Sequence, residues 1–379
     1  MGSVGRPPRA AALRELALLF GRLGATAFGG PAAHVAIMEH EVVRRRGWLT
    51  RAEFLDLLGA ANLIPGPNST EMAIHVGYRR AGLAGLAVAG AAFILPATVM
   101  VAAIGWAYVR YGTLPAADAL LRGVKPVVVA IVVQALVGFG RTAIRSRVLA
   151  AVALAALAAT LLGVDELAVL GAGGAAGALA RIWRRAGPAA LAWPALPASA
   201  VAAPAAAPAL GPIFLVFAKI GSVLFGSGYV LLAFLRTELV ERRGWLSESQ
   251  LLDAVAVGQV TPGPLFTTAT FVGYLLHGFS GAAAATLGIF LPAFVFVAAS
   301  GPLVPRIRRS AAAGAFLDGV NVASLALMAV VTLQLARAAL TGLAPGALAL
   351  ASAVLLARFR VNSTWLVLGG AAAGLALLR

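Results

Sequence analysis

The chain has 379 residues, of which 61% are apolar, 12% are charged and 43 are glycine. A soluble domain has about 45–50% apolar and about 25% charged residues, so this composition excludes an ordinary soluble protein and indicates a polytopic membrane protein. The net charge is +16. Its arginines lie in short clusters between apolar segments, as membrane topology requires, and no basic stripe is interleaved with aromatic residues. We therefore expect the lipid bilayer, and no nucleic acid, as a partner.

The residue types that carry most metal and redox chemistry are scarce. The chain has no cysteine, which excludes disulfides, thiolate nucleophiles and cysteine-ligated metals. Its four histidines form no HExxH pattern. We therefore expect no metal, no cofactor and no catalytic residues, in a protein that is not an enzyme.

The chain consists of two copies of one unit. Shifting the sequence by 197 positions lays residues 28–67 on residues 225–264 with 15 identities in 40 positions. About four identities are expected by chance, and the shared residues include glycine, tryptophan and proline. With one deletion, the alignment continues through Gly123 and Gly319. The sequence therefore predicts three parts, namely a first repeat (1–187), a Pro- and Ala-rich linker (188–211) and a second repeat (212–379).

Apolar segments predict the helices of the first repeat, which in chain order are 15–30, 54–64, 68–78, 83–109, 126–140, 148–163 and 166–180. Two segments of about eleven residues are too short to cross a hydrocarbon core of roughly 30 Å as helices. We expect these two to form a re-entrant hairpin of half-helices joined at Pro65-Gly66-Pro67. The second repeat has the same pattern around Pro262-Gly263-Pro264. The predicted fold is all-α, with about five transmembrane helices and one re-entrant hairpin in each repeat.

The positive charges change sides between the repeats. In the first repeat they gather on the face of the RRGW loop, around Arg44 to Arg46. In the second repeat the excess moves to the opposite face, around Arg306 to Arg309. Because Lys and Arg mark the cytoplasmic side of short loops, this pattern predicts that the two repeats are inverted relative to each other. Secondary transporters commonly combine inverted repeats with broken helices near the bilayer midplane.

Arg22 and Lys219 coincide under the 197-residue shift, and each lies inside an apolar segment. An Arg or Lys at mid-bilayer costs roughly 2.5–3.5 kcal/mol, so two symmetric cations indicate a cavity or a bound anion. We predict that they form a twofold cationic site. The alternative is that each side chain extends to the nearer membrane interface.

Glycine breaks follow both cations, at Phe28-Gly29-Gly30-Pro31 and at Phe225-Gly226-Ser227-Gly228. Adjacent glycines end one helix and leave free N–H groups at the start of the next, where anions bind favourably. We therefore predict substrate contacts at Gly29, Gly30, Gly226 and Ser227. The alternative is a kink or close helix packing.

The hairpin tips carry amide and hydroxyl groups near the start of a half-helix. Such groups donate hydrogen bonds without adding charge. The predicted substrate contacts are Asn62, Gly66, Asn68 and Ser69 in the first repeat and Gln259, Gly263, Thr267 and Thr268 in the second. The alternative is that they cap buried helix ends.

Glu71 is a lone carboxylate at the first hairpin, and its counterpart in the second repeat is Thr268. A carboxyl group at membrane depth is a candidate for proton transfer. We predict that Glu71 couples protons to transport. The alternative is an ion pair with Arg79 or Arg80.

Taken together, the motifs FGGP, RRGWLT, RRGWLS, NLIPGP and QVTPGP resemble the chromate ion transporter family in its long, two-repeat form. The resemblance implies a multi-pass carrier in the bacterial inner (plasma) membrane that exports chromate and confers chromate resistance, with sulfate as a look-alike substrate. Assembly into a homodimer is also compatible with the sequence. The halves are not equivalent, since the second reads FGSG and places Gln259 and Leu265 where the first has Asn62 and Asn68.

Electrostatics favours the export of a divalent oxyanion. With the cell interior negative, moving two negative charges outward gains about 4.6 kcal/mol at 100 mV. Export can therefore be driven by the membrane potential, with or without exchange of a proton or counter-anion. The alternatives are a sulfate or other oxyanion carrier and an anion channel. An intramembrane reductase lacks support, because the sequence carries no cysteine and no cofactor signature.

Overall fold

The structure, a computed structural model, describes residues 8–28, 30–112, 114–186, 208–225, 228–300, 310–359 and 361–377. Within these ranges the ordered elements are helices, and no strand occurs. The predicted contacts Gly29, Gly226 and Ser227, and most of the predicted linker, lie outside the described residues. The all-α fold predicted from the sequence is confirmed.

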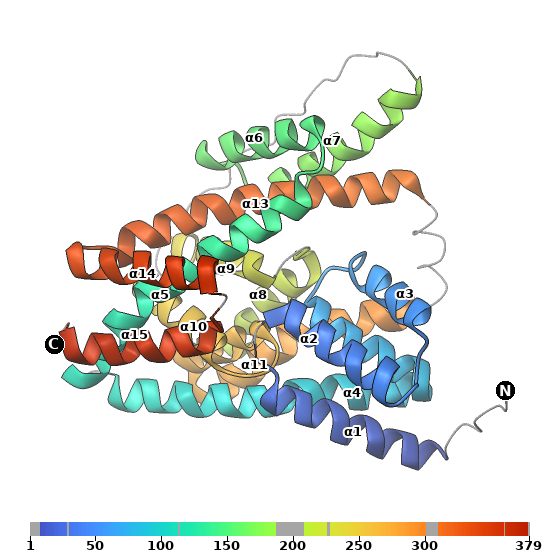
Figure 1. Cartoon of the computed structure of the whole chain (residues 1–379), viewed down its shortest axis with the longest axis horizontal. Coiled ribbons are helices and arrows are strands. Elements are labelled where there is room, and N and C mark those ends of the chain that lie inside the picture. The colour runs from blue at the N-terminus through green and yellow to red at the C-terminus, as the bar shows by residue number, and fades with distance from the viewer. Residues whose placement is uncertain are drawn as a thin grey trace.

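Corresponding helices follow one another in the same order in the two repeats (Figure 1). The first repeat contains α1 (Arg9–Thr26), α2 (Gly30–Glu39), η1 (His40–Arg45), α3 (Arg51–Ala61), α4 (Asn68–Tyr111), α5 (Pro115–Ala143), α6 (Arg147–Leu161) and α7 (Glu166–Ala186). The second contains α8 (Leu210–Val223), η2 (Gly228–Val230), α9 (Leu231–Leu235), η3 (Arg236–Glu241), α10 (Glu248–Val260), η4 (Leu265–Thr267), α11 (Thr268–Ser300), α13 (Ala311–Ala339), α14 (Leu343–Phe359) and α15 (Ser363–Leu377).

Four helical segments of the described chain are long and apolar enough to cross a membrane. They are Asn68–Tyr111, Pro115–Ala143, Leu265–Ser300 and Ala312–Ala339. The apolar segment 15–30 is not one continuous helix, because α1 ends at Thr26 and α2 begins at Gly30. The break falls at the FGGP motif, as the adjacent glycines predict, and Pro31 lies in the first turn of α2.

Each repeat contains the predicted hairpin of two short helices. In the first, a capping box between Thr50 and Glu53 starts α3. After the tip at Gly66, the chain runs back along the first part of α4. Arg79, near the end of that part, forms an ion pair with Glu53 at 3.1 Å. Both ends of the hairpin therefore lie together, and the predicted pair of half-helices is confirmed.

A second reversal follows each hairpin inside the long helices α4 and α11. In α4 it falls at Ala81 and Gly82, where Gly82 has a positive φ of 65°. Gly77 and Gly85 then face each other so closely that a side chain on either would collide with the backbone of the other. The second repeat reproduces this turn at Gly278 (φ 58°). Glycine is needed because other residues rarely adopt this backbone conformation.

The equivalent long helices α4 and α11 run antiparallel to each other. Gly90 of α4 packs against Phe294 of α11. Gly105, further along α4, packs against Tyr274, which lies next to the close contact between Gly273 and Gly281. Later positions of α4 therefore contact earlier positions of α11.

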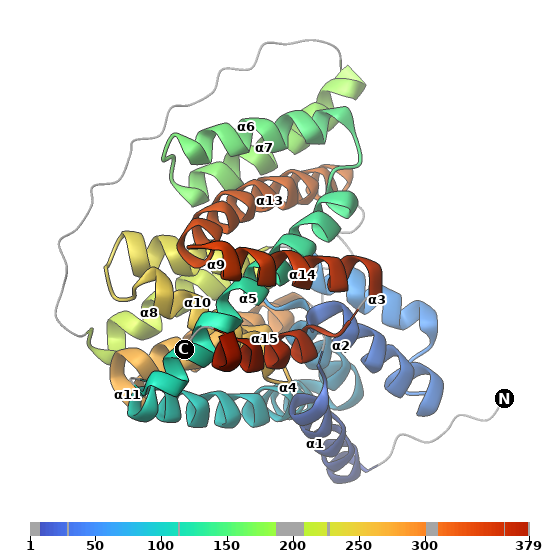
Figure 2. The same ribbon diagram turned by 60° about the vertical axis from the view of Figure 1, so that its left-hand side comes forward.

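The helices form two bodies, as two views show (Figures 1 and 2). The core bundle consists of the elements from α1 to α4 and from α8 to α11. The arm bundle consists of α5, α6, α7, α13, α14 and α15. In the arm bundle, glycines allow close helix packing, as is common in membranes. Gly123 of α5 contacts Gly370 and Gly374 of α15, and the equivalent Gly319 of α13 contacts Gly173 of α7.

Candidate functional site

A cavity of about 1260 Å³ lies between the first-repeat part of the core bundle and the arm bundle. Its walls come from α2, the first hairpin, α5, α13 and α14. Much of the lining is apolar. The polar and charged residues in it are Asn62, Asn68, Gln134, Arg141, Arg145, Asp318 and Asn321.

The first hairpin contributes two predicted site residues to this cavity. Asn62 follows α3 and Asn68 begins α4, so the tip brings their side chains together. The Nδ2 of Asn68 donates a hydrogen bond to the Oδ1 of Asn62 at 2.7 Å. Pro31, which follows the predicted contact Gly30 at the start of α2, also lines the cavity. Two separate sequence signals, the glycine break and the hairpin tip, therefore meet at one wall.

The hairpin-tip glycines have backbone partners in the opposite repeat. The N–H of Gly66 donates to the carbonyl of Leu224 at 2.8 Å. The N–H of Gly263 donates to the carbonyl of Ala27 at 2.9 Å. Each tip thus binds the helix break of the other repeat, and these two N–H groups hold the repeats together instead of remaining free for a substrate.

Helix α5 presents a polar stripe that the sequence analysis did not assign to the site. Gln134 and Arg141 lie seven residues apart in α5, a spacing that places them on one face of the helix. Arg145 follows just after the end of α5 at Ala143. All three line the cavity. The helical spacing of polar groups in an apolar segment was the available signal. In the second repeat the equivalent positions are Val330, Arg337 and Thr341, so the complete stripe occurs once.

Arg22 lies in an ion-pair cluster with Glu41. Its Nη2 is 2.6 Å from the Oε1 of Glu41, which also binds Arg45 at 3.1 Å and Arg46 at 3.3 Å. The side chain of Arg22 is 48% exposed, whereas that of Glu41 is 8% exposed. Hydrogen bonds from the three arginines outweigh the cost of burial and lower the pKa of Glu41.

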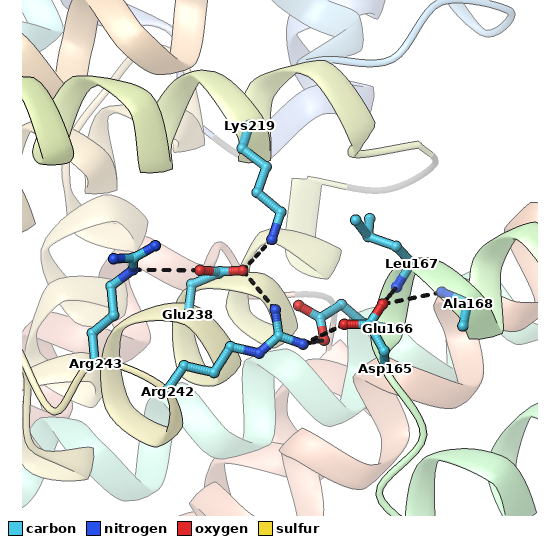
Figure 3. A network of polar contacts seen from close by, with 8 residues as sticks. All are labelled: Asp165, Glu166, Leu167, Ala168, Lys219, Glu238, Arg242 and Arg243. Atoms are coloured by element: carbon cyan, nitrogen blue, oxygen red, sulfur yellow. Dashed lines mark hydrogen bonds and ion pairs between the residues drawn. The ribbon is translucent and has the colours of Figure 1, made fainter. Parts of the chain in front are cut away.

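Lys219 occupies the equivalent cluster of the second repeat (Figure 3). Its Nζ binds Glu238, which also accepts from Arg242 at 2.8 Å and lies 3.5 Å from Arg243. Burial alone would raise the pKa of Glu238. The hydrogen bond from Lys219 and the positive charges of Lys219, Arg242 and Arg243 outweigh this effect and lower the pKa. The expected twofold cationic site is therefore not a pair of free charges. The structure places Arg22 and Lys219 in two separate clusters, because each has a carboxylate 19 residues further along the chain within reach.

The second cluster extends into the arm bundle. Arg242 binds both Asp165, which precedes α7, and Glu166, which begins α7, the latter at 2.9 Å. In Figure 3 the guanidinium of Arg242 points toward these two carboxylates. Burial opposes ionisation of Asp165, but the hydrogen bond from Arg242 and those from the backbone of Leu167 and Ala168 lower its pKa.

The tip of the second hairpin is buried and does not line the cavity. The hydroxyls of Thr267 and Thr268 donate to the carbonyls of Pro264 and Leu265, each at 2.8 Å. Gln259 is buried, and its Nε2 has no hydrogen-bond partner among the residues that the structure describes. The structure therefore brings two of the predicted contacts of the first hairpin, Asn62 and Asn68, to the cavity and keeps those of the second inside the core bundle.

Glu71 and Ser69 lie buried behind the tip of the first hairpin. Within the described part of the chain, neither carboxylate oxygen of Glu71 has a hydrogen-bond partner. The alternative of a pair with Arg79 or Arg80 does not hold, because Arg79 binds Glu53 and Arg80 binds Glu15. Glu71 is adjacent to the tip backbone, since a side chain at Gly66 would collide with its carboxyl group.

The structure combines long apolar helices, a pair of broken-helix hairpins and a cavity between two helix bundles that contains polar and charged side chains. These features define a polytopic membrane transporter. The profile of the chromate transporter family matches residues 14–178 and 211–375, one match in each repeat. The chain therefore belongs to the chromate transporter family.

Curated relatives match most of the chain. It is 34% identical to the chromate transport protein of Cupriavidus metallidurans over 369 residues, which cover 95% of this chain and 92% of that protein. It is 33% identical to the chromate transport protein of Pseudomonas aeruginosa over 339 residues, covering 85% and 81% of the two chains. A probable chromate transport protein of Synechococcus elongatus is 33% identical, with 86% of each chain covered. No solved structure matches the chain.

Proposed function

We propose that this protein is a carrier that exports chromate across the bacterial inner membrane and thereby confers chromate resistance. The cavity between the core and arm bundles carries this proposal, because it joins the first hairpin tip to a cationic helix face. The similarity to chromate transport proteins supports the choice of anion. Sulfate, which is also a tetrahedral dianion, is the second substrate that we propose.

Arg141 and Arg145 are the proposed anion-binding cations. Arg22 and Lys219 already bind buried carboxylates, so a substrate anion would have to compete with Glu41 and Glu238 for them. Arg141 and Arg145 line the cavity, and no ion pair is recorded for them among the described residues. Asn62, Asn68 and Gln134 add neutral groups that can donate hydrogen bonds to oxyanion oxygens.

Inverted repeats are part of the proposal. The antiparallel course of α4 and α11 supports the inversion expected from the positive charges. Export would then be driven by the membrane potential, with Glu71 as the proton-coupling group when protons are exchanged. A buried carboxylate without a partner is costly in its charged form, so taking up and releasing a proton would accompany movement of the site.

Flux measurements on the purified protein in liposomes test the function. We expect saturable uptake of radioactive chromate, competition by sulfate and stimulation by unlabelled chromate inside the vesicles. Arg141→Gln and Arg145→Gln should each raise the concentration for half-maximal flux by about tenfold, since a charge-assisted hydrogen bond contributes about 1.5–3 kcal/mol. Arg147→Gln is the matched control, because Arg147 lies two residues beyond Arg145 and does not line the cavity.

The same experiment separates the rival functions. An anion channel would give flux that does not saturate and is not stimulated by counter-substrate. Normal half-saturation in both arginine variants would exclude the α5 stripe as the binding site. Absence of chromate and sulfate flux from folded protein would contradict the proposed substrates.

A further inference from the structure

The two bodies touch on one side of the molecule and are separated on the other. On the second-repeat side, α10 packs against α5, α13 and α15, while η2 and α9 pack against α13. On the first-repeat side, the large cavity lies between α2, α3 and the arm bundle. Every residue of α10 from Leu251 to Gln259 is buried, whereas the buried residues of α3 are Phe54, Ala60 and Ala61.

The two repeats differ in this way although they are homologous and have their helices in the same order. If both halves adopted the same arrangement, α3 would pack against the arm bundle as α10 does. The structure is therefore an asymmetric state of an approximately symmetric molecule. An inverted-repeat carrier of this kind has a second state in which the two halves exchange arrangements.

Ion pairs cross between the bodies on the closed side. Arg242 of the core bundle binds Asp165 and Glu166 of the arm bundle. Lys125 of α5 lies 3.3 Å from the Oδ1 of Asp253 in α10 and donates to Ser249 at 2.6 Å. A hydrogen bond of 2.9 Å from Tyr108 also binds Asp253 within the core bundle. The five charged residues of these cross-body pairs, Arg242, Asp165, Glu166, Lys125 and Asp253, are called the latch below.

Among the described residues, the open side has no equivalent of the latch. The counterparts of Asp165 and Glu166 are the neutral Asn362 and Ser363 at the start of α15. The structure supports this alignment, because Asp165 caps α7 and Asn362 caps α15 through the same hydrogen bond to the residue two positions later. Similarly, the counterpart of Lys125 is the neutral Asn321, which lines the cavity.

We propose that the latch holds the carrier in the state with the first-repeat cavity open, and that the latch breaks when the second-repeat side opens in the transport cycle. This inference rests on the proposed function of an alternating carrier. The latch residues set the balance between two states and do not bind the substrate. Removing the latch should shift the population toward the opposite state, because the open side has no matching ion pairs to lose.

Single cysteines at equivalent positions can report the two states, since the chain has no native cysteine. Leu58 of α3 lines the cavity, and its counterpart Val255 of α10 is buried. In an otherwise unchanged chain, we expect a water-soluble maleimide to label Leu58→Cys quickly and Val255→Cys slowly. The double substitution Asp165→Asn and Glu166→Gln should raise labelling at position 255 and lower it at position 58. The ratio of the two rates should change by about fivefold, the factor that one modest ion pair contributes to an equilibrium.

New ion pairs introduced on the open side should shift the population toward the opposite state as well. In the proposed second state, Asn362→Asp with Ser363→Glu would bring carboxylates to Arg45, the counterpart of Arg242. This variant keeps a capping residue at position 362 and should also lower labelling at position 58 while raising it at position 255. Glu15→Gln is the control, since Glu15 binds Arg80 within the core bundle and should leave both rates unchanged.

The outcomes are distinguishable. Opposite changes at the two positions support the latch. A rise at both positions would mean that the acidic residues only stabilise the fold, and no change at either would mean that they do not bias the states; both results overturn the proposal. Because labelling requires no transported ion, its result is independent of whether chromate is the substrate.

Discussion

The backbone N–H of Gly66 donates to the carbonyl of Leu224 at 2.8 Å, so the tip of the first hairpin is bound to the helix break of the second repeat. The reciprocal bond joins Gly263 to Ala27 at 2.9 Å. These two bonds place the interrupted segments of both repeats at the centre of the core bundle. They also explain why the hairpins can be short, since each tip finds its backbone partner in the other half.

Gly263→Val should destabilise the protein. Gly263 has a φ of 89°, and a side chain there would lie 2.6 Å from the Cβ of Ala97. A β-branched residue in this conformation costs about 1–3 kcal/mol. We expect a lower thermal unfolding temperature in detergent and loss of monodisperse protein. An unchanged unfolding temperature would contradict the tight packing of the tip.

Adjacent glycines of α15 should respond differently to alanine. A side chain at Gly370 would press on Val127 and the backbone of Gly123, whereas the space around Gly369 is open. Gly370→Ala should therefore destabilise the protein by about 1–3 kcal/mol through overpacking. Gly369→Ala should be neutral or slightly stabilising, because alanine favours a helix. Equal effects on thermal unfolding would rule out the packing of α5 against α15 described above.

Lys219 and Glu238 should be energetically coupled. Lys219→Gln leaves Glu238, which is 2% exposed, with fewer compensating charges, so we expect lower stability. The double variant Lys219→Gln and Glu238→Gln should recover part of that loss, with a coupling energy of about 0.5–3 kcal/mol in a double-mutant cycle. Additive effects of the two substitutions on thermal unfolding would show that the pair does not contribute to the folded state.

Acid should weaken both ion-pair clusters. The pKa values of Glu41, Glu238 and Asp165 are lowered in the folded protein by their basic partners. Their contribution to stability is therefore fully present above the ordinary carboxyl pKa of about 4 and is lost as the pH falls through the lowered values. Thermal unfolding between pH 7 and pH 3 should show this loss, and Glu238→Gln should flatten part of the decline. If the unfolding temperature of the variant falls with pH in parallel with that of the native chain, Glu238 does not contribute to the acid sensitivity.

Glu71→Gln should remove the pH dependence of transport without unfolding the protein. Glutamine is nearly isosteric with a neutral carboxyl group, and Glu71 has no ion pair to lose. The readout is sulfate flux into liposomes with and without a pH gradient, because sulfate stays divalent across this range. Stimulation by the gradient should vanish in the variant. A variant that responds to the gradient like the native protein would exclude Glu71 as the coupling group.

The local architecture could be predicted because it depends on features that lie close together in the chain. Segments of about eleven apolar residues cannot span a bilayer as helices, and PGP between two of them predicts a hairpin tip. The repeat is visible because gene-doubled segments share an ungapped pattern of glycine, tryptophan and proline. The glycine breaks likewise follow from the preference of adjacent glycines for helix ends.

The chemistry of individual charges was decided by the tertiary structure. Arg22 and Lys219 are conspicuous in the sequence as cations in apolar segments, yet Glu41 and Glu238 neutralise them once the π-helical turns fold back. The arginines that line the cavity, Arg141 and Arg145, lie near the end of α5 and look like ordinary loop charges in the sequence. Whether a cation forms an ion pair or lines the cavity depends on helices that are distant in the chain.

The sequence by itself determined a doubled, all-helical membrane protein with a broken hairpin in each half. The length of the apolar segments, the identity between the repeats and the positions of glycine and proline can all be read from residues that are close together in the chain. Only the tertiary structure decided which half faces the cavity and which half packs against the arm bundle. Because the two repeats have their helices in the same order, the pattern within each repeat does not specify which of them packs against the arm bundle. The difference between them therefore arises from contacts between distant helices, such as Arg242 with Asp165 and Lys125 with Asp253.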